Sequence, residues 1–268
     1  MNLKTPLIDE AGMSDPHALV RGDTVYLFTG HDVGFGVPDW VMPDWRIYRS
    51  TDLQSWEHVG TIRPDDCYLG PGCTSCWAGD IVERDGRFFW YFSHPKNGTG
   101  VMCAEQPEGP YTDALGHALV DSFDPTIFVE DDGTPYILYG HGDYKIARLK
   151  ENMIELAETP RSLPLDRRGM FPVMDKNSLH KRNGIYYLGC SGYYATSRNL
   201  CGPYVHQGLV GEGMGLDTPY AHGDFFVWKG EWFHVWCKYR DRDHDRIRDC
   251  FLAPVAYDED GGMRHRQA

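Results

Sequence analysis

The amino-acid sequence predicts an all-β protein with the fold of a five-bladed β-propeller, and three observations carry this prediction. Five segments each read as a β-hairpin, because apolar and aromatic runs flank a short turn that contains glycine. An ionisable residue stands six to nine positions before each of these turn glycines. These opening residues recur 44 to 65 positions apart, close to the repeat of about 40–50 residues that is typical of propeller blades. The five openers are Asp15, Asp80, Asp124, Asp175 and His222.

The openers predict where a functional site would lie. If each one begins the innermost strand of its blade, all five side chains converge on one mouth of the central channel. An otherwise apolar strand has no packing use for a carboxylate at its start, so these side chains need a partner or a chemical role. The functional interpretation depends on this convergence.

The first blade is expected to begin at Asp15, after an N-terminal arm. Its inner hairpin turns at Arg21-Gly22-Asp23, and residues 45–60 read as two outer strands joined by a turn near Thr51. The connecting loop, residues 31–45, is rich in glycine, tryptophan and acidic side chains, more than a plain connector needs. We expect this loop either to contribute to a binding site or to cover the edge of the blade.

The second and third blades follow the same plan. Trp77 to Asp80 leads into the inner strand of the second blade, which turns at Asp85-Gly86. The third blade opens at Asp124 and turns at the acidic run that ends in Gly133. Its edge strands are expected in residues 144–158, where an amphipathic helix is the alternative.

The last two blades are expected to open at Asp175 and His222, with turns at Asn183-Gly184 and Lys229-Gly230. The tail after Met263 is expected to be disordered. No linker, low-complexity tract or change of composition divides the chain, so residues 1–268 are predicted to form a single domain.

Composition narrows the functional classes. The net charge of −13 argues against a nucleic-acid partner, which requires a basic surface. No run approaches 18 apolar residues, so no contact with a membrane is expected. The N-terminal residues lack the apolar core of a signal peptide, and we therefore expect a cytoplasmic protein with reduced thiols. Cys73 and Cys76 have the spacing of a metal-binding pair, but no second pair completes a site.

Three carboxylates that converge on a channel mouth are a suitable set for glycoside hydrolysis. One is ionised and activates water, another is held protonated and donates to the leaving oxygen, and the third tunes their pKa values. The alternative is that the acids only bind ordered water in the channel. The abundant aromatic residues serve the cores of the sheets, and some are expected to stack on sugar rings.

A resemblance supports the catalytic interpretation. The segments DPHALVRGDTVYLFTG, CWAGDIVERDGRFFWYFS, DPTIFVEDDGTPYILYG and HKRNGIYYL, in this order, resemble those of glycoside hydrolase family 43. That family comprises five-bladed propellers, including arabinofuranosidases and β-xylosidases, with an inverting mechanism. The resemblance implies that Asp15 is the general base, that Asp124 tunes and orients the acid, and that the fourth blade opens with the general acid. It also places the channel histidine on His222 and an arginine of the last blade on Arg248.

The sequence departs from the family at the general acid, because Asp175 stands where the resemblance implies glutamate. Aspartate is one methylene shorter, and a displacement of about 1 Å can reduce the rate about a hundredfold. Lys176 would also lower the pKa of Asp175 if the two side chains approached. The backbone could compensate, His180 or Glu212 could be the acid instead, or activity toward ordinary glycosides could be lost.

We therefore predict an exo-acting, inverting hydrolase that removes terminal α-L-arabinofuranose or β-D-xylose from plant-type oligo- and polysaccharides. The residues expected to contact the sugar are His31, Trp45, Trp77, Asp80, His180, His222 and Arg248. The rivals are a related glycosidase with another acid, acting on galactosides, anhydro-sugars or uronic-acid glycans, and a propeller that binds sugar without cleaving it. A scaffold for protein partners is a third class, which does not need the ring of acids. No cofactor is expected to be required, although a structural Ca²⁺ in the channel near His222 is a further expectation.

Overall fold

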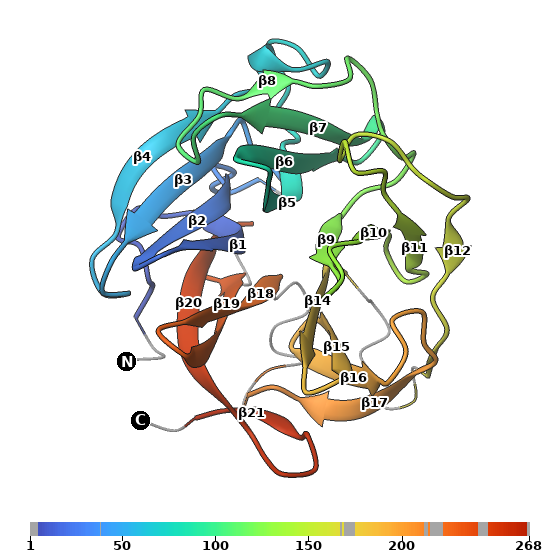
Figure 1. Cartoon of the computed structure of the whole chain (residues 1–268). Helices are drawn as coiled ribbons and strands as arrows, with labels where there is room; N and C mark the ends of the chain where they lie inside the picture. The colour runs from blue at the N-terminus through green and yellow to red at the C-terminus, as the bar shows by residue number, and fades with distance from the viewer. Residues whose placement is uncertain are drawn as a thin grey trace.

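The computed structural model describes residues 5–37, 39–166, 168, 175–211, 214, 222–240 and 246–266. Five sheets are arranged around a central channel (Figure 1), and the predicted five-bladed β-propeller is confirmed. Each blade contains a four-stranded antiparallel meander that runs from the channel outward, and the innermost strands are β1 (Met13–Arg21), β5 (Trp77–Arg84), β9 (Thr126–Val129), β14 (Asn177–Arg182) and β18 (Gly223–Trp228). Neighbouring inner strands contact one another around the channel.

The blades follow one another along the chain. Blade one contains β1 (Met13–Arg21), β2 (Thr24–His31), β3 (Trp45–Ser50) and β4 (Glu57–Ile62), and a 3₁₀ turn, η1 (Pro64–Asp66), follows it. Blade two contains β5 (Trp77–Arg84), β6 (Arg87–His94), β7 (Gly98–Ala104) and β8 (Thr112–Asp113). Blade three contains β9 (Thr126–Val129), β10 (Pro135–Tyr139), β11 (Lys145–Arg148) and β12 (Arg161–Ser162). Blade four contains β13 (Leu165–Asp166), β14 (Asn177–Arg182), β15 (Ile185–Cys190), β16 (Tyr193–Ser197) and β17 (Tyr204–Leu209). Blade five contains β18 (Gly223–Trp228), β19 (Glu231–Tyr239), β20 (Arg248–Tyr257) and β21 (Met263–His265).

The hairpin turns have the backbone that their sequences predict. Asp85-Gly86, Asn183-Gly184 and Lys229-Gly230 each have two successive positive φ angles, between 49° and 80°. A two-residue turn of this kind matches the right-handed twist of the strands that it joins. Local turn chemistry therefore fixes the register of the inner hairpins of blades two, four and five.

The structure corrects two details of the sequence interpretation and confirms a third. Residues 263–265 are not disordered, because they pair with β20 as β21. The expected turn at residues 150–153 joins Leu149 to Leu156, and the helical alternative is wrong, since the only helical element among the described residues is η1. Blade four gains an unforeseen strand, since β13 runs parallel to β17. None of the described helices is long and apolar enough to cross a membrane.

The hydrophobic core is divided among the seams between neighbouring blades, with one apolar cluster at each seam. At the seam of blades one and five, the described strands of each blade all come from its own end of the chain, and none of them is exchanged between the two blades. The N-terminal arm lies against this seam, where the Leu7 amide donates a hydrogen bond of 2.7 Å to the carbonyl of Cys250. Ile8 is buried in the same apolar cluster. Side-chain packing and this arm therefore close the ring.

Candidate active site

A pocket of about 270 Å³ lies at the end of the channel where the inner strands begin. Four of the five openers line it, since Asp15 lies near the start of β1 and the others lie just before β9, β14 and β18. The convergence on which the functional interpretation depends is therefore present for four blades. The residues that line the pocket are Asp15, Trp40, Met42, Trp77, Ala78, Phe123, Asp124, His141, Asp175, His222 and Arg248.

Two of the carboxylates sit on unusual backbone. Asp15 and Asp124 have φ angles of 46° and 60°, and each is followed by proline. Proline disfavours the right-handed helical region for the residue before it, and aspartate tolerates the left-handed region better than most residues. In blade one this conformation coincides with a break in the pairing of β1 with β2 between Ser14 and His17. Strained backbone of this kind concentrates at functional sites.

Arg248 of β20 holds Asp15 in its ionised form. Its Nη2 donates to Asp15 Oδ2 at 2.9 Å, and its Nε donates to Asp32 Oδ2 at 2.9 Å. All three side chains are at most 3% exposed. Burial opposes the charge on Asp15, but Arg248 and His222 outweigh burial and hold the pKa of Asp15 well below its ordinary value. Asp15 is thus a carboxylate that can accept a proton from water.

His222 lies between two carboxylates. Its Nδ1 is 2.7 Å from Asp15 Oδ1, and its Nε2 is 2.7 Å from Asp175 Oδ2. Burial lowers the pKa of His222, but the two carboxylates raise it to about 10, so the ring is an imidazolium at neutral pH. The imidazole ring of His222 and its two short contacts therefore separate the carboxyl of Asp15 from that of Asp175. This arrangement is consistent with the roughly 6.5–9.5 Å between the two carboxyls of inverting glycosidases.

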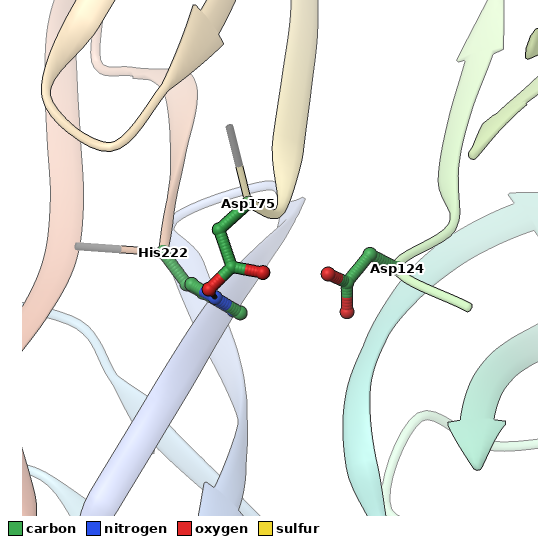
Figure 2. Close-up of side chains that lie close together, drawn as sticks. All are labelled: Asp124, Asp175 and His222. Carbon is green, nitrogen blue, oxygen red and sulfur yellow. Dashed lines mark hydrogen bonds and ion pairs between the residues drawn. The ribbon is translucent and has the colours of Figure 1, made fainter. Parts of the chain in front are cut away.

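Asp124 and Asp175 form a coupled pair. Figure 2 shows their carboxyl groups facing each other, with His222 beside Asp175. Burial, then the charge of Asp175, raises the pKa of Asp124 to about 8. Burial also opposes the charge of Asp175, but His222 and His141 overcome it and hold the pKa of Asp175 well below its ordinary value. At neutral pH the pair therefore carries one proton, and the raised pKa of Asp124 favours that carboxyl as the site of the proton.

His141 completes the wall beside Asp175. It lies in the loop after β10, with Nδ1 3.4 Å from Asp175 Oδ1, and its ring is tilted against Phe123 at a centroid distance of 6.1 Å. Its side chain is 44% exposed, whereas that of Asp175 is 11% exposed. The neighbouring carboxylate raises the pKa of His141.

The structure places the predicted site residues in two groups. Asp15, Asp124, Asp175, Trp77, His222 and Arg248 line the pocket, and the roles predicted for them stay predictions. His31, Trp45, Asp80 and His180 do not line it. Glu212, the second alternative acid, lies outside the described residues.

The four displaced residues have structural partners that account for their positions. Trp45 is fully buried in the core between blades one and two, and its indole donates to the Trp77 carbonyl at 2.8 Å. His31 Nδ1 is 2.8 Å from Asp44 Oδ1. Asp80 accepts a hydrogen bond of 2.6 Å from the amide of Ile127 in blade three. His180 is stacked on Tyr187 at the seam of blades four and five.

Five pocket residues were missed by the sequence interpretation as sugar contacts: Trp40, Met42, Ala78, Phe123 and His141. The tryptophan-rich loop of blade one was the sequence feature that could have indicated Trp40 and Met42. Trp40 stacks on the ring of Tyr239 and lies 4.1 Å from the guanidinium carbon of Arg248. Phe123 directly precedes the opener Asp124, and His141 lies just after the hairpin of β9 and β10. The start of β9 and the end of β10 both lie at the channel mouth, because the two strands are antiparallel.

Buried polar side chains fill the channel beneath the pocket. Lys176 is 1% exposed, and the carboxylates that act on its charge belong to four blades, which places it at the centre of the ring. Its Nζ donates to Asn177 O at 2.9 Å, and Asn177 is itself fully buried. His17 is 1% exposed and lies 3.1 Å from Asp80. The pocket is therefore blind, with access only from its mouth.

Three side chains of the pocket have the spacing of a metal-binding group. Asp124, Asp175 and His222 offer ligand atoms within 4.8 Å of one another. Both ring nitrogens of His222 already face carboxylates at 2.7 Å, and a protonated imidazolium has no lone pair for a metal. Asp175 likewise has an imidazole at each oxygen. As bonded in this structure, these three residues do not fit a metal site.

Comparisons with known proteins agree with this geometry. The sequence model described as "Glycosyl hydrolases family 43" matches residues 4–263. The chain is 27% identical to an arabinoxylan arabinofuranohydrolase of Paenibacillus polymyxa, over 86% of this chain and 45% of that protein, so it spans less than half of that relative. It is 26% identical to a xylosidase/arabinosidase of Bacteroides ovatus, over 93% of each. The solved structure of a family-43 enzyme from Xanthomonas citri with xylotriose is alike in fold, with a TM-score of 0.86 and 22% identity over 98% of this chain and 92% of that one.

Proposed function

Because this chain belongs to glycosyl hydrolases family 43, we propose that it is an exo-acting, inverting glycoside hydrolase that releases terminal α-L-arabinofuranose or β-D-xylose. The observation that carries the proposal is the pair of carboxylates, Asp15 and Asp175, on opposite sides of the His222 imidazolium. This separation leaves room for a water molecule on one face of the sugar, as single displacement requires. The names of the relatives, an arabinofuranohydrolase and a xylosidase/arabinosidase, support the choice of sugars.

The shape of the pocket supports action on a chain end. The pocket volume of about 270 Å³ is slightly smaller than the roughly 300–1,000 Å³ of sites that enclose drug-sized ligands. The filled channel beneath it gives a polymer no second exit. The aromatic side chains of Trp40, Trp77 and Phe123 give the wall apolar surface of the kind that sugar rings contact. A terminal sugar is therefore the substrate unit that the pocket fits.

Asp15 has the properties of the general base. It is ionised and held in place by Arg248, so it can take a proton from the attacking water as the oxygen bonds to the anomeric carbon. The leaving oxygen is protonated from the side of the pocket on which Asp175 lies. The carboxyl of Asp175 is itself ionised in the free enzyme. Asp124 shares one proton with Asp175 and sets the charge of that side.

Catalysis by these groups needs no metal ion. The His222 imidazolium already supplies a positive charge between the carboxylates, and a cation bound to its ring would first have to displace a proton from it. The structural Ca²⁺ expected near His222 from the resemblance therefore does not fit these side chains as they are bonded.

The proposal is tested by product release and by the configuration of the product. Wild type and Asp15→Asn are incubated with aryl β-D-xyloside, aryl α-L-arabinofuranoside and arabinoxylan fragments, and the anomer first formed is followed by proton NMR. We expect release of a pentose with inverted configuration, reduced at least a hundredfold in the variant. Product with retained configuration would overturn the mechanism.

The same experiment addresses the rival functions. Saturable binding of a xylo-oligosaccharide without any product would favour a propeller that binds sugar but does not cleave it. This outcome is worth testing because an ionised Asp175 has no proton to donate to the leaving oxygen. Release of galactose or a uronic acid instead of a pentose would keep the hydrolase and change its substrate.

A further inference from the structure

We propose that His141 is a catalytic residue of this enzyme: its imidazolium delivers the proton to the leaving glycosidic oxygen, and Asp175 holds and orients the ring. The inference rests on the hydrolase function proposed above and deepens it by naming the proton donor. Asp175 then acts as the partner of the donor rather than as the donor itself.

Asp175 is poorly placed to donate a proton to a substrate. Its Oδ2 is occupied by His222 Nε2 at 2.7 Å, and its Oδ1 faces His141 Nδ1 at 3.4 Å. The side chain is 11% exposed, so little of it borders the space that a substrate would fill. Aspartate is also one methylene shorter than the glutamate expected here, so its carboxyl reaches less far into the pocket.

His141 has the position that Asp175 lacks. It belongs to the loop that joins β10 to β11, next to Gly140, whose φ of 115° favours glycine and turns the chain. A Cβ at residue 140 would lie 2.6 Å from the Asp143 carbonyl, so the tight turn that presents His141 depends on this glycine. With 44% of its side chain exposed, the imidazole lines the pocket between the buried carboxylate and solvent.

The charges around His141 favour its protonated form. Asp175 raises the pKa of His141 through the contact with Nδ1, and Asp124 raises it further, whereas partial burial and the charge of His222 lower it. The His141 ring also lies against the uncharged ring of Phe123. With Nδ1 directed at Asp175, Nε2–H is left as the proton that can face a substrate oxygen.

Asp124 is the competing donor, because it carries the proton of the buried pair in the free enzyme. Its carboxyl is only 2% exposed, and it faces Asp175 (Figure 2). Loss of that proton would leave two ionised carboxylates in direct opposition, which is unfavourable in a buried site. Loss of the His141 proton leaves one neutral ring beside one carboxylate, so His141 gives up its proton at the smaller electrostatic cost.

The step balances as follows. Asp15 removes a proton from water while the water oxygen bonds to the anomeric carbon. The bond from that carbon to the leaving oxygen breaks, and the leaving oxygen takes the Nε2 proton of His141. Neutral His141 and protonated Asp15 return to their starting forms by exchange with solvent, and no co-reactant is consumed.

The test compares two leaving groups in wild type and His141→Gln. A dinitrophenyl glycoside leaves without protonation, whereas an alkyl glycoside or a xylo-disaccharide requires it. We expect kcat/KM for the unactivated substrates to fall about 10²–10⁴-fold in the variant, and for the dinitrophenyl substrate to fall less than about tenfold. The fall of wild-type activity at alkaline pH should also disappear in the variant, and added imidazole should restore part of the lost rate.

Two variants serve as controls in this comparison. His117→Gln changes an exposed histidine outside the pocket and should behave as wild type toward every substrate. Asp15→Asn should lose both substrates equally, because activation of water is needed whatever the leaving group. Equal losses with both substrates in His141→Gln, or no loss, would overturn the proposal. A selective loss in Asp124→Asn instead would assign the donor to Asp124.

A direct titration separates this inference from the function on which it rests. The ring protons of His141 are followed by NMR in wild type and in Asp175→Asn, and we expect a pKa above the ordinary value of histidine that falls in the variant. An unchanged pKa would refute the pairing even in an active enzyme. If wild type hydrolyses none of the glycosides, the proposed function fails and the catalytic role of His141 fails with it, whatever the titration gives.

Discussion

His180 provides a sharp test of the packing between blades four and five, through the dependence of stability on pH. The ring lies parallel to that of Tyr187 at a centroid distance of 4.8 Å, packs against Phe225 at 4.8 Å, and has Nε2 2.7 Å from the hydroxyl of Tyr257. Its Nδ1 has no hydrogen-bond partner within the portion of the chain that the structure describes. Burial, with a smaller effect of Arg182, lowers the pKa of His180 to about 3.

The size of the effect follows from linkage. In the unfolded chain the ring takes up a proton near pH 6.5, whereas the folded protein excludes it until about pH 3. The free energy of unfolding from this one residue is therefore fully present above pH 6.5 and is lost as the pH falls toward 3. At about 1.36 kcal/mol per pKa unit, the loss between pH 7.5 and 5 is about 2 kcal/mol.

The measurement is urea unfolding of wild type and His180→Gln at pH 7.5 and at pH 5. Glutamine can keep a hydrogen bond to Tyr257, and the variant is expected to be less stable at pH 7.5 because the stack is altered. On acidification, however, it should lose about 2 kcal/mol less than wild type does. His117→Gln, with an exposed ring, should follow the wild type. Parallel losses in wild type and His180→Gln would show that the buried ring accepts a proton in the folded state and would refute the reasoning.

Two further predictions concern the catalytic end of the channel. Arg248→Leu leaves Asp15 and Asp32 buried without their counter-charge, so we expect the free energy of unfolding to fall by about 3–5 kcal/mol and the pKa of Asp15 to rise; an unchanged urea midpoint would mean that water or another cation replaces the guanidinium. Treatment with EDTA should leave hydrolysis at pH 6–7 unchanged, because His222 supplies the positive charge between the carboxylates; loss of activity that Ca²⁺ restores would contradict this view of His222.

The fold could be predicted from the sequence because its strongest signals are local and repeated. Turns such as Asp85-Gly86 and Asn183-Gly184 determine their backbone from two residues, and the structure has the predicted positive φ angles. The openers are tied to these turns by a short, regular spacing, so knowledge of the architecture was enough to bring Asp15, Asp124, Asp175 and His222 to one mouth. No long-range contact had to be known in advance.

The errors arose where position depends on contacts between blades. Trp45 and Trp77 look equivalent in the sequence, yet Trp45 packs in the core beside Trp90 while Trp77 borders the pocket. The face that a residue presents follows from strand register, and register breaks occur in β1 and β5 at the very residues that lead into the channel. A one-residue irregularity moves a side chain to the other face, and composition gives no sign of it.

The role of His141 was invisible to the sequence for a different reason. A single histidine in a loop carries no periodic pattern, and its meaning depends on Asp175, 34 positions away. Likewise, the pKa values of Asp124 and Asp175 diverge only because the two carboxyls meet inside a buried pocket. The sequence could assign residue types to the site but not the distribution of protons among them.

The seam between blades one and five joins the two ends of the chain without a shared strand, and the ion pairs of Arg248 cross it. This arginine belongs to the last blade, whereas Asp15 and Asp32 belong to the first, so the contact that keeps Asp15, the proposed general base, ionised is also a contact that holds these two blades together. Any fluctuation that parts these blades removes the guanidinium from Asp15 and admits solvent to its carboxyl. Such a molecule would lose hydrolytic activity while most of its sheets were still intact. Closure of the ring of blades and ionisation of Asp15 therefore depend on the same ion pairs.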